Sequence, residues 1–127
     1  MRIAPEEEVA SFLEEVNRRL RESFRNLYIP KRTNSEDKNY LFMIESGLNN
    51  EMICEYIMDI DVLNYSKTES DNDHGREGEV WFFGKDLKLP LVSEYVEVYI
   101  KLKLQRKVVC LSFHPKEFDI HYPYLNS

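Results

Sequence analysis

The chain has 127 residues, of which 43% are hydrophobic and 13% aromatic, and its formal net charge is −6. This length has room for one modest core, and the composition excludes wholesale disorder. No apolar run approaches the roughly 20 residues that span a bilayer. Glu6, Glu7 and Glu8 stand where a secretory signal needs positive charge. We therefore expect a single cytoplasmic domain over residues 1–127.

The net negative charge argues against indiscriminate binding of nucleic acid over the whole surface. The charge is uneven, however. Residues 1–79 carry 10 basic and 18 acidic side chains, a sum of −8, whereas residues 80–107 carry 6 basic and 3 acidic side chains, a sum of +3. A local basic patch can therefore exist on an acidic protein.

The two cysteines, Cys54 and Cys110, each lie in an apolar stretch and far apart in the sequence. Isolated cysteines of this kind fit the reduced, buried thiols of a cytoplasmic protein. A disulfide between them is the alternative.

Three helices are expected in the first half of the chain. Apolar residues recur at spacings of three and four over residues 6–27, which predicts an amphipathic helix. A second helix is capped by Asn34 or Ser35 and stops at Gly47. The third is capped by Asn49 or Asn50 and extends to residue 60.

Residues 66–79 contain almost no apolar side chain, which predicts a loop. Asp71, Asp73 and His74 in this loop suggest metal ligands, but their spacing does not fit a calcium loop. No pair of cysteines has the spacing of a zinc site. We expect neither a metal nor a cofactor.

Strands are expected at residues 79–85, 96–104 and 108–114, with a short fourth edge strand at 118–122. Helices followed by such strands predict an α+β domain, with the N-terminal helices on one face of a three- to four-stranded antiparallel sheet. Strict alternation in the second strand directs one row of apolar side chains toward the first helix. That row contains Val96, Val98, Ile100, Leu102 and Leu104.

The opposite face of the same strand presents groups that can move protons and hold a phosphate. Histidine titrates nearest neutrality, lysine binds phosphate oxygens, and tyrosine stacks on bases or donates a hydrogen bond. Trp81 and Phe83 fit a core better than base stacking, but Trp81 stays among the candidate RNA contacts. The predicted RNA-binding residues are Lys85, Lys103, Arg106 and Trp81.

The order of elements resembles the MqsR-like toxins of bacterial toxin–antitoxin pairs, within the RelE/ParE-type superfamily. The resemblance covers residues 38–115 and lies in the runs Tyr65-Ser66-Lys67, Trp81, Val98-Tyr99-Ile100-Lys101-Leu102 and Leu111-Ser112-Phe113-His114. It implies a RelE/MqsR-like fold and a metal-independent endoribonuclease that cuts mRNA. It also implies a cognate antitoxin as partner, for which we expect a small helix-turn-helix protein.

Residue by residue, Lys67 falls on the family's lysine after the third helix, and Tyr99 and Lys101 fall on its Tyr-[Leu/Ile]-Lys motif. His114 stands where the family has a lysine, and Phe82 stands where MqsR has a glutamine. The predicted catalytic residues are His114, Tyr99, Lys101 and Lys67.

A second hypothesis is a non-enzymatic interaction or inhibitor protein of the same fold that acts through its acidic surface. The net charge of −6 and the departures at His114 and Phe82 favour it.

Overall fold

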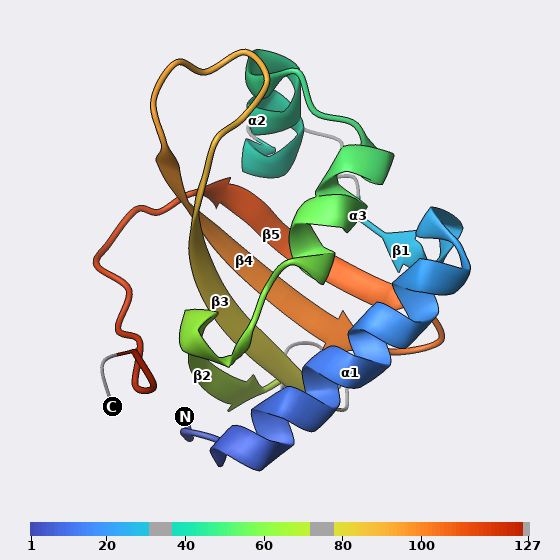
Figure 1. Ribbon diagram of the computed structural model, residues 1–127, viewed down its shortest axis with the longest axis vertical. Helices are drawn as coiled ribbons and strands as arrows, with labels where there is room; N and C mark the ends of the chain where they lie inside the picture. The colour runs from blue at the N-terminus through green and yellow to red at the C-terminus, as the bar shows by residue number, and fades with distance from the viewer. Residues whose placement is uncertain (31–36, 72–77, 126–127) are drawn as a thin grey trace.

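The computed structural model describes residues 1–30, 37–71 and 78–125. Within these ranges, three α-helices and two single 3₁₀ turns accompany one sheet (Figure 1). The helices are α1 (Glu6–Glu22), α2 (Lys38–Ser46) and α3 (Asn50–Met58), and the 3₁₀ turns are Phe24–Asn26 and Val62–Asn64. The strands are β1 (Leu27–Tyr28), β2 (Tyr65–Ser70), β3 (Glu79–Leu87), β4 (Val96–Leu104) and β5 (Val108–Pro115). The predicted α+β class is confirmed.

The sheet differs from the prediction of three or four antiparallel strands. In the described part of the chain it has five strands in the order β1-β5-β4-β3-β2, and β1 runs parallel to β5. The prediction missed β1 because only Leu27 and Tyr28 pair with β5. A two-residue strand is too short to show an alternating pattern.

Residues 66–70, predicted to be loop, belong to β2, and residues 67–70 pair with β3. Their polar composition suits an edge position, where one side of the strand meets water. The outer edge of β2 is paired in turn by the N-terminal segment, since Arg2 and Thr68 exchange two backbone hydrogen bonds of 2.9 Å. Asp73 and His74 lie outside the described residues.

Residues 118–122 do not form the predicted fourth edge strand. Residues 116–125, here called the C-terminal tail, leave β5 without regular structure and cross the end of the sheet (Figure 1). Tyr124 at its far end donates a hydrogen bond to the Ala4 carbonyl. The tail therefore closes against the N-terminal segment instead of adding a strand.

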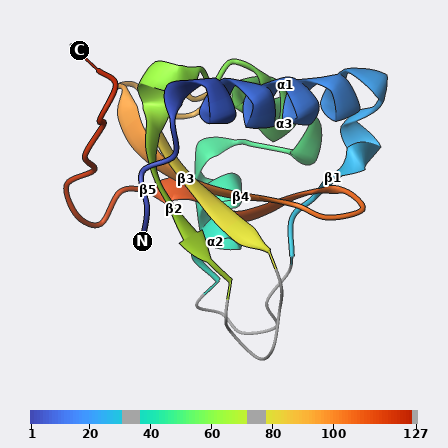
Figure 2. The same ribbon diagram turned by 90° about the horizontal axis from the view of Figure 1, so that it is seen from below.

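Helices α1 and α3 cover one face of the sheet (Figure 2). Phe12 of α1 stacks on Trp81 with ring centroids 4.4 Å apart and planes at 13°. Below the helices, Val98, Ile100 and Leu102 are completely buried, whereas Tyr99 between them is not. The predicted packing of the first helix on this apolar row is confirmed.

Helix α1 is shorter than predicted: it ends at Glu22, whereas the sequence pattern predicts a helix to residue 27. Ser23 is extended, with φ −168° and ψ 137°, and its hydroxyl accepts a hydrogen bond from the backbone N–H of Arg25. This local bond competes with the helical one. Leu27 is then free to join the sheet as β1.

The two following helices have the predicted stop and start signals. Gly47 ends α2 in the left-handed conformation with φ 72°, and the Asn49 side chain caps α3 by accepting from the Met52 N–H. The N-cap of α2 is Asp37, two residues after Ser35 and three after Asn34, the two expected caps. Asn34 and Ser35 lie outside the described residues.

Cys54 and Cys110 are both free and buried, as predicted. Burial raises the pKa of the Cys110 thiol to about 12, so this sulfur stays protonated at neutral pH. None of the helices in the described ranges has the length and apolar character that a membrane span requires.

Asn39 attaches α2 to β5, at residues of β5 that follow the two paired with the short strand β1. Its side-chain amide donates to the Leu111 carbonyl at 3.0 Å and accepts from the Phe113 N–H at 2.8 Å. One side chain thus replaces a neighbouring strand along two residues of β5. The bonds hold α2 beside the end of β5.

We expect Asn39→Ala to lower the free energy of unfolding by about 2–4 kcal/mol, because it leaves two partly buried backbone groups of β5 without partners. Urea denaturation at neutral pH measures the change. Asn50→Ala, at an exposed position in the first turn of α3, is the matched control and should change stability by less than about 0.5 kcal/mol. Equal effects of the two substitutions would contradict this role of Asn39.

Candidate functional site

The sheet face turned away from α1 and α3, here called the open face, brings together all four predicted catalytic residues. The strand register explains this: Phe82 is opposite both Lys67 and Lys101, and Tyr99 is opposite His114. Residues directly opposite each other on neighbouring strands have side chains on the same face. The four side chains therefore lie on one face of the sheet.

Phe82 lies at the centre of this group. The Lys67 ammonium is 4.7 Å from the centroid of the Phe82 ring, and the Lys101 ammonium is 5.1 Å from it. Both distances are within the range of cation–π attraction. Lys67 also forms an ion pair of 3.1 Å with Glu69. The ring thus holds two cations at one place on an acidic protein.

Phe82 was not among the predicted site residues. Its signal in the sequence is the run Trp81-Phe82-Phe83, in which period-two alternation places the middle aromatic on the face opposite its neighbours. A buried aromatic on an otherwise polar face is the feature that identifies it, with only 5% of its surface exposed.

Tyr99 connects Phe82 to the histidine. Its ring centroid is 6.0 Å from that of Phe82 and 5.5 Å from that of His114. Burial, helped by the nearby carboxylates of Glu69 and Glu117, raises the pKa of Tyr99 to about 12. The hydroxyl therefore keeps its proton at neutral pH and can act as a hydrogen-bond or proton donor, not as a base.

His114 is only 8% exposed. Its Nδ1 lies 2.9 Å from the Pro115 carbonyl oxygen. Because a carbonyl can only accept, Nδ1 donates this bond, and the neutral ring keeps Nε2 as its acceptor. A hollow between α2 and the end of β5 is lined by His114, Lys38 and Glu117 among others, and gives the ring its access to the surface. The Lys38 ammonium is bonded to the Glu117 carboxylate at 2.6 Å.

The predicted RNA-binding residues are placed less consistently. Lys103 lies on the open face, but its side chain is only 3% exposed and forms an ion pair of 2.7 Å with Asp71. A cation that is already buried and paired has little to gain from a phosphate. Lys103 is therefore held by Asp71 near the end of β4 and offers no accessible charge to RNA.

Lys85, predicted as an RNA-binding residue, does not lie on the open face with Lys101 and Lys103. In the strand register Lys85 is opposite Val98, which is buried and faces the helices. The Lys85 ammonium donates a hydrogen bond of 2.5 Å to the carbonyl of Asp59, the residue that follows α3. Strand alternation explains this placement, since Lys85 is two residues from Phe83 and shares its face.

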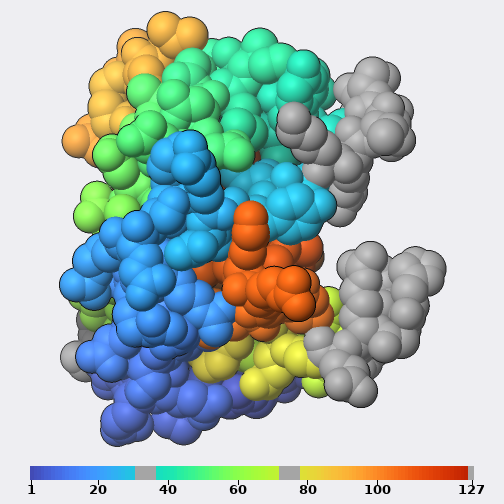
Figure 3. Space-filling model, turned by 90° about the vertical axis from the view of Figure 1, so that its right-hand side faces the viewer, coloured from blue at the N-terminus to red at the C-terminus, as the bar shows by residue number. Residues whose placement is uncertain are grey.

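Trp81 and Arg106 also lie apart from the group. Trp81 is 7% exposed and stacks on Phe12, so it belongs to the core under α1. Arg106 lies in the exposed turn between β4 and β5, at the opposite end of β4 from Tyr99. Figure 3 shows this turn, in orange, at the surface between the β1 segment and the start of β3.

Among the described residues, no three His, Cys, Asp or Glu side chains are placed to hold a metal ion. The open face carries an imidazole, a phenol and ammonium groups. These groups suffice for proton transfer next to a phosphate.

Compared with protein-family models, with the curated proteins and with the solved structures, the chain matches none of them.

The raised pKa of Tyr99 predicts its behaviour in an alkaline titration. Its folded-state pKa of about 12 lies above the ordinary value of 10, so this tyrosine favours the folded state below pH 10, and the contribution is lost as the pH rises toward 12. Tyrosinate absorbance at about 295 nm is measured as the pH rises, for the wild type and for Tyr99→Phe. The two titration curves should differ only near pH 12, where Tyr99 ionises in the wild type. A difference that is already present near pH 10 would contradict the burial of this hydroxyl.

Proposed function

We propose that this protein is a metal-independent endoribonuclease that cleaves mRNA, the toxin of a toxin–antitoxin pair similar to the MqsR-like toxins. The observation that supports this best is the placement of Lys67, Tyr99, Lys101 and His114 on the open face, where Phe82 contacts both lysines and Tyr99, and Tyr99 contacts His114. In the sequence these residues are spread over almost fifty positions. In the proposed reaction His114 is the base, Tyr99 is the acid, and the two lysines share the stabilisation of charge.

The reaction begins when Nε2 of His114 takes the proton from a ribose 2′-hydroxyl. The 2′-oxygen then attacks the adjacent phosphorus, and the ammonium groups of Lys67 and Lys101 stabilise the negative charge on the phosphorane. The bond from phosphorus to the 5′-oxygen breaks, and the Tyr99 hydroxyl gives its proton to that oxygen. The products are a 2′,3′-cyclic phosphate and a 5′-hydroxyl.

The binding site uses local charge on a protein whose total charge is −6. Lys67 and Lys101 attract the phosphate, whereas the partly exposed ring of Tyr99 presents aromatic surface to a base. Glu69 bonds Lys67 in the free protein at 3.1 Å, so bound phosphate has to compete with this carboxylate. In the proposed system, a cognate antitoxin, expected to be a small helix-turn-helix protein, blocks the site in resting cells.

The second candidate function is that of an interaction protein with the same fold and no catalysis. The slight exposure of His114, 8%, and the carboxylates of Glu69 and Glu117 beside Tyr99 favour it. Its partner would be basic, because the surface as a whole is acidic.

Catalysis is tested by incubating single-stranded RNA with the purified protein in EDTA. We expect cleavage without metal, and a decrease of about 10²–10⁴-fold for His114→Ala, the range of a lost general base. Tyr99→Phe should cost nearly as much if its hydroxyl protonates the 5′-oxygen, whereas a loss below about tenfold would leave this residue only a stacking role. His121→Ala, an exposed histidine of the C-terminal tail, is the control. Full activity of His114→Ala would exclude the mechanism.

Binding tests the patch separately from the chemistry. On single-stranded RNA, each phosphate contact contributes a slope of about −0.7 to the log–log dependence of affinity on salt. Lys101→Ala should make the slope shallower by about that amount. Lys85→Ala should leave it unchanged, because Lys85 lies on the other face. A wild-type slope near zero, or equal effects of the two substitutions, would exclude the open face as the RNA site.

A further inference from the structure

The C-terminal tail is held on the open face by several contacts with β4. The Lys116 N–H donates to the Glu97 carbonyl at 2.9 Å, and the Lys116 ammonium is 2.9 Å from the Glu97 carboxylate. The Tyr122 hydroxyl donates to the other oxygen of this carboxylate at 2.7 Å. Glu97 therefore binds the tail at two places, Lys116 and Tyr122.

Gly84 of β3 provides the space in which the tail lies. A Cβ atom at this position would collide with the Tyr122 hydroxyl and would be 2.7 Å from Cδ1 of Ile120. Gly84 is directly opposite Tyr99 in the register. The tail thus passes beside the candidate catalytic group in direct contact with the sheet.

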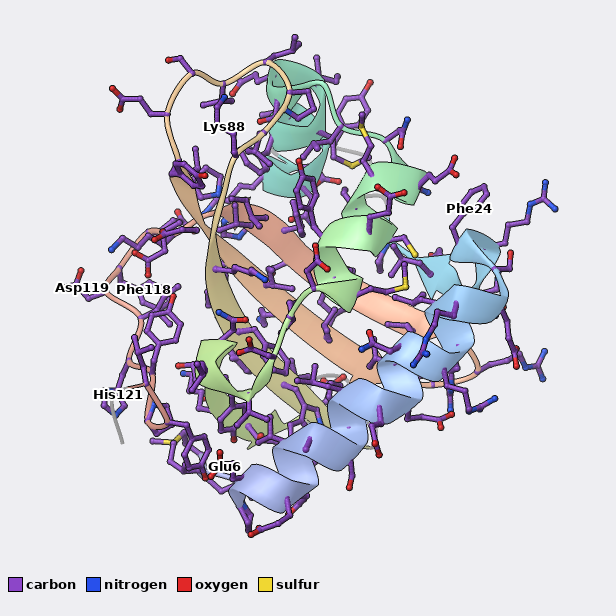
Figure 4. All side chains as sticks on the ribbon, viewed as in Figure 1. Glu6, Phe24, Lys88, Phe118, Asp119 and His121 are labelled. Carbon is purple, nitrogen blue, oxygen red and sulfur yellow. The ribbon has the colours of Figure 1, made fainter. Side chains whose placement is uncertain are left out.

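The seated tail brings Phe118 against Tyr99. Their ring centroids are 5.4 Å apart and their planes are at 69°, an edge-to-face arrangement. Phe118 is nevertheless 57% exposed. Figure 4 shows Phe118, Asp119 and His121 along the margin of the sheet. The row of rings that begins at Phe82 and continues through Tyr99 therefore ends in an aromatic side chain that is open to solvent.

We infer that Phe118 is a substrate-binding residue whose ring stacks on an unpaired base of the RNA. This inference rests on the proposed function. Proteins that bind single-stranded nucleic acid combine cations, which bind the phosphates, with aromatic rings, on which the bases stack. Lys67 and Lys101 supply the cations, and an exposed ring beside Tyr99 supplies the stacking surface. Phe118 lies outside residues 38–115, so it belongs to this chain's own tail and not to the stretch that carries the resemblance.

The test measures binding without cleavage. The probe is a fluorescent single-stranded oligoribonucleotide with methylated 2′-hydroxyls, which removes the nucleophile, and its partner probe has the same backbone with abasic sites. We expect Phe118→Ala to weaken binding of the first probe by about 5- to 100-fold, the range for one lost stacking contact. Phe118→Trp should restore it, and Phe118→Leu should not. Binding of the abasic probe should be the same for all variants.

The control for disturbance of the tail is His121→Ala, which changes an exposed residue of the same segment and should bind both probes like the wild type. Unchanged or tighter binding by Phe118→Ala would overturn the inference, as would an equal loss for both probes. A wild type that binds neither probe would overturn this inference and the proposed function together. If the wild type binds the first probe through Phe118 but cleaves no RNA, the proposed nuclease activity is excluded and the inference about Phe118 stands.

Discussion

The alternation of side chains along the β3–β4 hairpin is the constraint on which the rest of the structure depends. Trp81, Phe83, Ile100 and Leu102 are directed to the helices, so Phe82, Tyr99 and Lys101 must face the other way. A shift of one residue in this register would exchange the two faces. The energy of burying the apolar row under α1 and α3 therefore also fixes the position of the candidate site. Each fully buried large apolar side chain contributes roughly 1.5–3 kcal/mol to this preference.

Segments outside the main strands satisfy backbone groups on two sides of the sheet. On the β5 side, the Asn39 side chain of α2 forms hydrogen bonds with the backbone of β5. The preceding residue, Lys38, is bonded to Glu117 beside His114. On the β2 side, the N-terminal segment pairs with Thr68. Covered edges prevent pairing with other chains. Here the same contacts connect the stability of the domain to the accessibility of the site.

The electrostatics of the open face depend on aromatic rings as much as on charges. Phe82 attracts Lys67 and Lys101 although the protein carries a net charge of −6. Tyr99 keeps its proton because burial disfavours its anion, with Glu69 and Glu117 adding to the effect. An aromatic ring thus holds both cations on the open face.

The sequence by itself determined the class of fold, the apolar row of β4, the stop at Gly47 and a cap at Asn49 or Asn50, because each of these depends on local geometry or on periodicity. It also indicated His114, Tyr99, Lys101 and Lys67, through the resemblance. Only the tertiary structure decided that these four share one face, that Lys85 lies on the other, and that Lys103 is buried with Asp71. The pairing of β1 with β5, the bonds of Asn39 and the seat of Phe118 also connect residues that are far apart in the chain. Periodicity describes one element at a time, whereas register, edge contacts and the path of an irregular tail depend on which elements meet in space.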